Sequence, residues 1–83
     1  MSGVPTVLRI DGFRFYFYSH EPNEPPHVHV DAAESSAKIW LESVEVARNL
    51  GFRTKQLNVI LGHVSEHRLM LLEAWHEFFG GNR

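Results

Sequence analysis

The sequence contains no cysteine. This excludes disulfide bonds and thiolate zinc sites, and it fits a protein kept in a reducing compartment. The N-terminal residues form no apolar signal core, and no apolar run approaches the roughly 20 residues that a membrane span needs. We therefore expect a soluble cytoplasmic protein with no membrane partner. The formal net charge of −2 argues against a protein that coats polyanions non-specifically, although it is compatible with a local basic patch.

The apolar content of the chain is enough for one small core. Its 83 residues are 43% hydrophobic and 22% charged, values typical of a globular protein, so we expect a single domain over residues 1–83. A chain of this length buries only about 60% of its unfolded surface, which makes a homodimer a reasonable expectation. Histidine is the unusual component, with six residues.

Alternating segments in the first half of the chain indicate β-strands. Residues 7–10 and 13–18 flank Asp11 and Gly12, and an Asp-Gly loop of two residues predicts a hairpin because both residues tolerate a positive φ. The segment 21–26 contains three prolines, which cannot donate to a sheet. Residues 27–32 and 37–41, separated by a polar turn, are the predicted third and fourth strands.

The second half of the chain carries helix signals. Ser43 can cap a short helix over residues 44–50, which Gly51 ends. Thr54 can cap a long helix, in which apolar residues recur at helical spacing until the two glycines at 80–81. The sequence therefore predicts an α+β fold with an N-terminal antiparallel sheet of about four strands. A short helix and a long C-terminal helix packed on one face of the sheet complete it.

The predicted hairpin sorts the side chains of the sheet onto two faces. With Asp11 and Gly12 as the loop, Ile10 pairs with Phe13 and Arg9 with Arg14. The core face then carries Leu8, Ile10, Phe13, Phe15, Phe17, Val28, Val30, Ile39 and Leu41. The opposite face, called here the outer face, carries Arg9, Arg14, Tyr16, Tyr18, His27, His29, Lys38 and Trp40, with Asp31 and Glu42 at strand ends.

The composition of the outer face indicates a binding surface. Two arginines placed opposite each other repel, so folding alone would not select them. Aromatic rings interleaved with cations suit the bases and phosphates of nucleic acids. This predicts RNA binding through Arg9, Arg14, Tyr16, Tyr18, Lys38 and Trp40.

His27 and His29 are the candidate catalytic residues of this face. An imidazole can take a proton from a ribose 2′-OH or give one to a leaving oxygen, without a metal or another cofactor. Whether the protein is a metal-independent ribonuclease or only holds RNA stays open at this point. The same face can instead dock a partner protein or a second copy of the chain, with Tyr16, Tyr18 and Trp40 as anchors.

A divalent metal is a weaker hypothesis for the same histidines. His27 and His29 lie two residues apart on one strand face and can supply two ligands, with a third from Glu21, Glu24 or Asp31. A site needs three or four convergent ligands, and a pair of histidines arises easily by chance. We therefore assign no metal to the sequence.

Three polar residues of the predicted long helix need separate explanations. His63 and His67 match the H-x-x-E-H pattern of inverzincin proteases, but only residues 68–83 follow them, so we regard the match as coincidence. We expect His63 to be solvated and His67 to bond a neighbouring element. Arg68 falls within the apolar stripe, which predicts a carboxylate partner, either Glu45 or Asp31.

Taken whole, the chain resembles a family of short bacterial proteins, domain-of-unknown-function family 4160. The stretches that carry the resemblance are PTVLRIDGFRFYFYSHEPNEPPHVHV (5–30), AKIWLESVEVARNLGF (37–52) and EHRLMLLEAWHEFF (66–79). The matching motif positions are Arg14, Tyr18, Glu24, Pro25, Pro26, His27, His29, Lys38, Trp40, His67, Arg68 and Trp75. The chain departs mildly at Pro22, where a polar residue is expected.

The resemblance implies a function that agrees with the outer face. Genes of this family commonly sit beside a second small gene, which implies a two-gene toxin–antitoxin module. This family would supply the toxin, and a cognate small antitoxin-like protein would be its partner. Small toxins of this kind often act on RNA or on translation.

Overall fold

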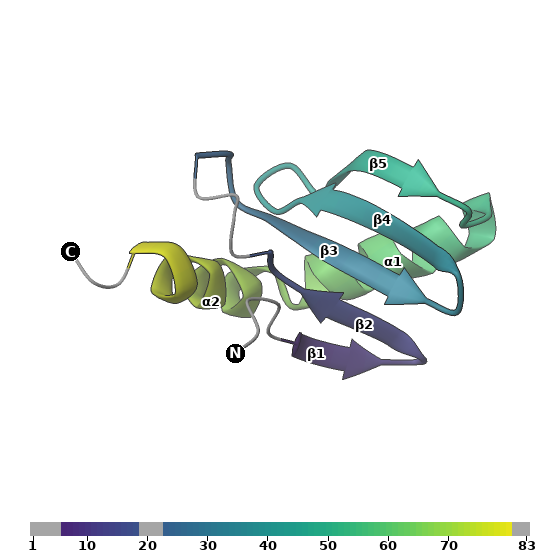
Figure 1. Ribbon diagram of the computed structural model, residues 1–83, viewed down its shortest axis with the longest axis horizontal. Helices are drawn as coiled ribbons and strands as arrows, with labels where there is room; N and C mark the ends of the chain where they lie inside the picture. The colour runs from purple at the N-terminus through teal and green to yellow at the C-terminus, as the bar shows by residue number, and fades with distance from the viewer. Residues whose placement is uncertain (1–5, 19–22, 81–83) are drawn as a thin grey trace.

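The structure, a computed structural model that describes residues 6–18 and 23–80, is an antiparallel sheet followed by helices (Figure 1). Within these residues the strands are β1 (Thr6–Ile10), β2 (Phe13–Tyr16), β3 (His27–Ala32), β4 (Ser35–Trp40) and β5 (Glu45–Leu50). The helices are α1 (Thr54–Glu66) and α2 (Arg68–Gly80). The strands lie side by side in sequence order. The predicted α+β class is confirmed, with five strands where about four were expected.

The β1–β2 hairpin has the predicted turn and register. Asp11 and Gly12 adopt φ values of 53° and 83°, the positive values that a two-residue type I′ turn requires. Ile10 lies opposite Phe13, and Arg9 lies opposite Arg14. The turn therefore sets which side chains reach the core.

The predicted short helix over residues 44–50 is wrong, because this segment forms strand β5. β5 pairs with β4 from Ser36 opposite Leu50 to Trp40 opposite Glu45, with a bulge between the pairs. Val44 turns the chain with a φ of 56°, so Ser43 starts no helix. The alanine, arginine and leucine of this segment favour helix locally, but pairing supplies the hydrogen-bond partners that β4 needs along this edge.

Gly51 ends β5 rather than a helix. Its φ is 103°, a value that residues with a side chain rarely adopt. A Cβ placed on Gly51 would also lie 2.7 Å from Ser35 Oγ. Both constraints require glycine where the chain leaves β5 for α1.

The predicted long helix is divided at His67. The backbone N–H of His67 donates to the carbonyl of His63, and α2 begins at the next residue, Arg68. Thr54 is the first helical residue rather than the cap, which is Arg53. The N–H of Arg53 donates to Gln56 Oε1 over 2.9 Å, which satisfies one group at the start of α1.

The core lies between the helices and the predicted face of the sheet. In Figure 1, α1 passes behind the central strands, so the outer face is turned toward the reader. The predicted core residues Phe13, Phe15, Phe17, Val28, Val30, Ile39 and Leu41 are buried, together with Ile60, Val64, Leu71 and Trp75 of the helices. Leu8 packs against this cluster while partly exposed. Among the described residues, no helix has the length and apolar content to cross a membrane.

The β3–β4 turn offers a test of the backbone. Ala33 is exposed and has a φ of 53°, a conformation that costs a residue with a Cβ about 1 kcal/mol. We expect Ala33→Gly to raise the free energy of unfolding by about 0.5 kcal/mol, because relief of this strain exceeds the extra entropy of the unfolded chain. Chemical denaturation measures the difference.

The matched control is Ala47→Gly in β5, where the alanine is also exposed but has no positive φ. We expect this control to be neutral or destabilising, since glycine weakens a strand. If Ala33→Gly destabilises the protein as much as the control does, residue 33 does not adopt the left-handed conformation in solution.

Candidate functional site

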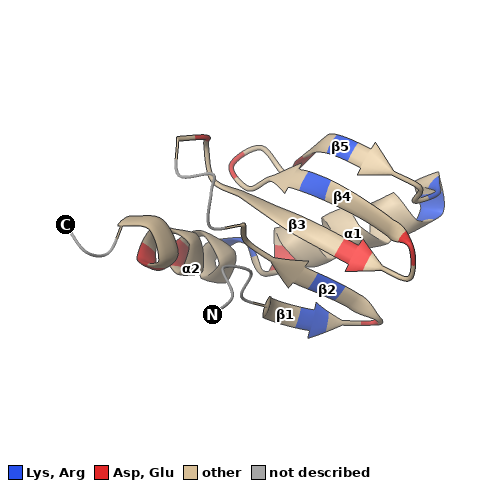
Figure 2. Cartoon of the chain, in the orientation of Figure 1, with Lys and Arg blue, Asp and Glu red and all other residues tan. Residues whose placement is uncertain are grey.

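The register of the sheet brings the charged residues of the outer face into one band. Arg9 lies opposite Arg14 between β1 and β2. On the other side of β3, Lys38 lies opposite Arg48 between β4 and β5. Figure 2 shows the basic residues on β1, β2, β4 and β5, with an acidic residue on β3 between them. Like-charged residues thus face each other twice on one face.

An aromatic cluster occupies the centre of the outer face, between these cations. The ring of His29 stacks on Tyr16 with centroids 5.5 Å apart, and the ring of Tyr18 lies 4.4 Å from His29. His27 is 5.1 Å from His29 and 5.7 Å from Trp40. Each such pair contributes about 0.5–1.5 kcal/mol beyond area burial. The cluster therefore holds these rings in fixed relative positions.

Tyr16 is the more firmly anchored ring of the pair that it forms with His29. Its side chain is 4% exposed, and its hydroxyl donates to Asp31 Oδ1 over 2.9 Å. Burial first, and then the hydrogen bond to the Asp31 carboxylate, raise the pKa of Tyr16 well above its usual range. Tyr16 therefore stays a protonated donor at every physiological pH.

His27 and His29 differ in accessibility, although both lie on central strand β3. His27 is 1% exposed, and its Nδ1 is 2.9 Å from the carbonyl oxygen of Pro25. A carbonyl only accepts, so Nδ1 of His27 carries the proton in this bond. His29 is only partly buried and borders open surface. The geometry gives His27 a positioning role for the neighbouring rings, and the catalytic assignment of both histidines stays a prediction.

Two of the predicted cations already have partners on the protein. Lys38 Nζ donates to Glu24 Oε1 over 2.5 Å and lies 4.9 Å from the centre of the Trp40 ring. The guanidinium of Arg14 lies 4.5 Å from the Tyr16 ring centre, and its Nε donates to Thr6 Oγ1. These contacts hold both cations against aromatic rings of the outer face.

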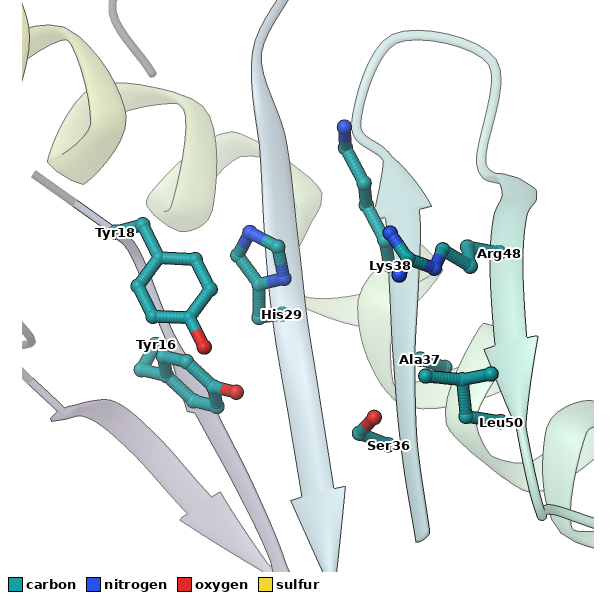
Figure 3. Close-up of a pocket in the computed structure, with 8 residues that line it drawn as sticks. All are labelled: Tyr16, Tyr18, His29, Ser36, Ala37, Lys38, Arg48 and Leu50. Atoms are coloured by element: carbon teal, nitrogen blue, oxygen red, sulfur yellow. The ribbon is translucent and has the colours of Figure 1, made fainter. Parts of the chain in front are cut away.

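A hollow of about 190 Å³ opens between the aromatic cluster and β5 (Figure 3). Figure 3 shows the rings of Tyr16, Tyr18 and His29 on one side, with Arg48 and Leu50 on the other. Its lining consists of Tyr16, Tyr18, His29, Ser36, Ala37, Lys38, Arg48 and Leu50. The hollow exists because the small side chain of Ser36 projects from β4 between these larger neighbours.

The sequence prediction missed four residues of this hollow, Ser36, Ala37, Arg48 and Leu50. Arg48 and Leu50 were assigned to a helix, which removed them from the sheet. Residues 45–50 read polar, apolar, apolar, polar, polar, apolar, which is not the alternation that indicates a strand, so the sequence carried no periodic signal for β5. Arg48 is exposed and forms no ion pair or hydrogen bond within the described residues.

His27 and His29 lack a third side chain placed to bind a metal ion with them among the described residues. In residues 6–18 and 23–80, no group of three His, Cys, Asp or Glu residues is placed to hold a metal ion. Glu24 comes within 3.7 Å of His27 Nδ1 but pairs with Lys38. Asp31 accepts from Tyr16. The remaining candidate ligand, Glu21, lies outside the described residues, as does the departure from the family pattern at Pro22.

The expectations for His63, His67 and Arg68 are wrong in their partners. His63 is not simply solvated, since its Nε2 lies 2.9 Å from Asp11 Oδ2 and joins α1 to the hairpin turn. His67 lies between the two helices, and its Nδ1 is 3.0 Å from the carbonyl oxygen of His63 in α1, so it bonds the preceding turn rather than a distant element. Arg68 Nε donates to the carbonyl of Leu41 over 2.8 Å rather than to a carboxylate. The turn after β4 leaves this carbonyl without a strand partner, and Arg68 satisfies it.

The ionisation of Tyr16 tests the geometry of the cluster. The chain has two tyrosines, so Tyr18→Phe leaves Tyr16 as its single phenol. Because burial and Asp31 raise the pKa of Tyr16, the folded variant should show no phenolate absorbance near pH 10, the ordinary value for tyrosine. Absorbance is expected only when the protein unfolds in base.

The same shift has a consequence for stability. Above about pH 10 the unfolded chain loses the Tyr16 proton while the folded chain keeps it, so the free energy of unfolding falls as pH rises. Tyr16→Phe should make that fall shallower in denaturation curves. A phenolate signal near pH 10 from folded Tyr18→Phe protein would contradict the burial of Tyr16.

Comparison with known proteins gives one match. The model of the family described as "Domain of unknown function (DUF4160)" matches residues 12–76. This segment includes β2 to β5, every residue that lines the hollow, and all of the predicted site residues except Arg9. No curated protein and no solved structure matches the chain.

Proposed function

The chain belongs to the DUF4160 family, and we propose that its outer face binds single-stranded RNA. The observation that carries the proposal is the pairing of like charges on both sides of an aromatic cluster. Arg9 faces Arg14, and Lys38 faces Arg48. Such pairs repel. Asp31 opposite Arg14 and Glu24 on Lys38 offset part of this repulsion, and a bound polyanion would offset more of it.

The aromatic rings favour RNA with unpaired bases over other polyanions. Tyr18 is 40% exposed, and its ring meets His29 at the rim of the hollow. Bases stack on such rings only when they are not paired in a helix, and stacking contributes about 1–3 kcal/mol per base. An open sheet that presents aromatic side chains between cations is a common platform for single strands.

The overall acidity of the chain is compatible with this proposal. Figure 2 marks acidic residues on α2 and in loops, whereas the band across the sheet is mainly basic. An RNA strand at the outer face responds mainly to charges within a Debye length, about 8 Å at physiological salt. The local band therefore matters more for binding than the net charge of −2.

We also propose the toxin role that the family resemblance implies, with RNA as the target and a small antitoxin-like protein as the partner. If RNA is cleaved, His29 is the better placed general base of the two histidines, because it borders the hollow while His27 is buried. His27 would then act by holding the ring of His29 in place.

Salt dependence tests RNA binding. We expect the affinity for a labelled single-stranded RNA, measured by fluorescence anisotropy, to fall with salt by a slope of about 0.7 per phosphate contacted. The double substitution Arg9→Gln/Arg14→Gln should weaken binding and reduce that slope. The matched control is Arg53→Gln/Lys55→Gln, which removes the same charge at the start of α1 and should leave the slope nearly unchanged.

Two results would contradict the RNA proposal. One is the absence of RNA binding at low salt, and the other is an equal loss in both double variants. A salt-insensitive homodimer that buries Tyr18, detected by sedimentation, would support the interaction-module alternative instead.

Growth assays test the toxin role and catalysis together. We expect expression of the protein alone to arrest growth, and His29→Ala to relieve the arrest as fully as His27→Ala/His29→Ala does. Purified His29→Ala should lose cleavage by a much larger factor than it loses RNA affinity, which separates a proton-transfer role from a contact role. Equal toxicity of the double variant and the unmodified protein would exclude catalysis by these histidines.

A further inference from the structure

The hollow beside β5 indicates how the outer face engages RNA. We propose that it is a subsite for one unpaired nucleobase, with the phosphate of the same nucleotide on Arg48. This inference rests on the proposed function and assigns part of it to residues that the sequence analysis placed in a turn (Ser36) or in a helix (Arg48 and Leu50). It concerns Ser36, Arg48 and Leu50, together with the rings of Tyr18 and His29.

The shape of the hollow fits one planar ring. Neighbouring strands lie about 4.8 Å apart, so β3 and β5 stand roughly 10 Å apart. Ser36 of β4 lies between Asp31 and Leu50, and Lys38 lies between His29 and Arg48. A flat ring in van der Waals contact with both sides needs about 7–8 Å. The volume of about 190 Å³ is below that of pockets for drug-sized ligands. A single base therefore fits better than a folded peptide segment.

The two sides of the hollow are suited to the two faces of a base. Tyr18 and His29 present aromatic rings, and Tyr16 holds His29 in place by stacking. Leu50, which is 54% exposed, presents an aliphatic surface from the opposite side (Figure 3). Exposure of the Leu50 side chain to water is unfavourable, and a nucleobase that covers it removes apolar surface from water.

The polar groups of the hollow are suited to the edge and the phosphate of a nucleotide. The hydroxyl of Ser36 lies between the two sides, makes no hydrogen bond within the described residues, and can both donate and accept. Arg48 presents a planar guanidinium, whose donors match two phosphate oxygens at once. Lys38 is held by Glu24, so Arg48 is the principal phosphate ligand.

Titration with adenosine 5′-monophosphate and uridine 5′-monophosphate tests the subsite. In ¹H–¹⁵N NMR spectra we expect both to shift the amides of Ser36, Arg48 and Leu50. Arg48→Gln and Leu50→Ala should each weaken this binding about fivefold or more. Ser36→Leu, which fills the hollow, should abolish it. The matched controls Arg53→Gln and Ser43→Leu, which lie outside the hollow, should bind as the unmodified protein does.

Inorganic phosphate and the nucleosides serve as probes for each half of the site. Each should bind more weakly than the monophosphate if base and phosphate are held together. Phosphate binding as tight as that of the monophosphates would overturn the base subsite and leave a simple anion site. Arg48→Gln and Leu50→Ala replace exposed side chains, so they test the site even if Ser36→Leu fails to fold.

The same variants separate this inference from the proposed function. If RNA affinity falls in Arg9→Gln/Arg14→Gln but not in Arg48→Gln or Ser36→Leu, RNA binding stands and the subsite is wrong. If monophosphates bind in the hollow but single-stranded RNA does not bind, the proposed function is wrong. In that case the hollow is a site for free nucleotides, and its assignment as part of an RNA surface is overturned.

Discussion

The two-residue turn at Asp11 and Gly12 is the constraint on which the outer face depends. Because side chains alternate along a strand, a slip of one residue would move every phenylalanine of β2 outward and every polar residue inward. The strands follow one another in the sheet, so the face that β2 turns to the core has to match the core faces of its neighbours. The pairing of β4 with β5, which places Arg48 opposite Lys38, contains a bulge between Lys38 and Ile39 and sets its own register.

The outer face combines buried, hydrogen-bonded residues with exposed residues that can contact a ligand. Tyr16 and His27 are almost completely buried. The hydroxyl of Tyr16 donates to Asp31, and Nδ1 of His27 donates to the Pro25 carbonyl. They hold the rings of His29 and Trp40 but have little surface for a ligand. A surface that is rigid before binding loses less conformational entropy when the ligand arrives. Burial of these two residues therefore supports binding by their neighbours.

The sequence was sufficient wherever the structure depends on local patterns. The hairpin, its register and the two faces of the sheet follow from one turn and a period of two. β5 could not be found in this way, because its residues favour a helix when taken alone and form a strand through pairing with β4. The division of the long helix at His67 has no glycine or proline to mark it. Arg68 was recognised as unusual, but its partner is a backbone carbonyl, which no sequence pattern identifies.

The correction at β5 changes the functional argument as well as the fold. With residues 44–50 in a helix, the cations of the outer face lie mainly on β1 and β2, and one of them, Arg9, precedes the segment that matches the family. With β5 in the sheet, Arg48 faces Lys38, and Arg48 and Leu50 line one side of the hollow opposite the aromatic cluster. Every residue that lines this hollow lies within residues 12–76. Arg14, Lys38 and Arg48 all lie inside the shared segment and Arg9 does not, so the β4–β5 side is the one that places both members of a cation pair within it.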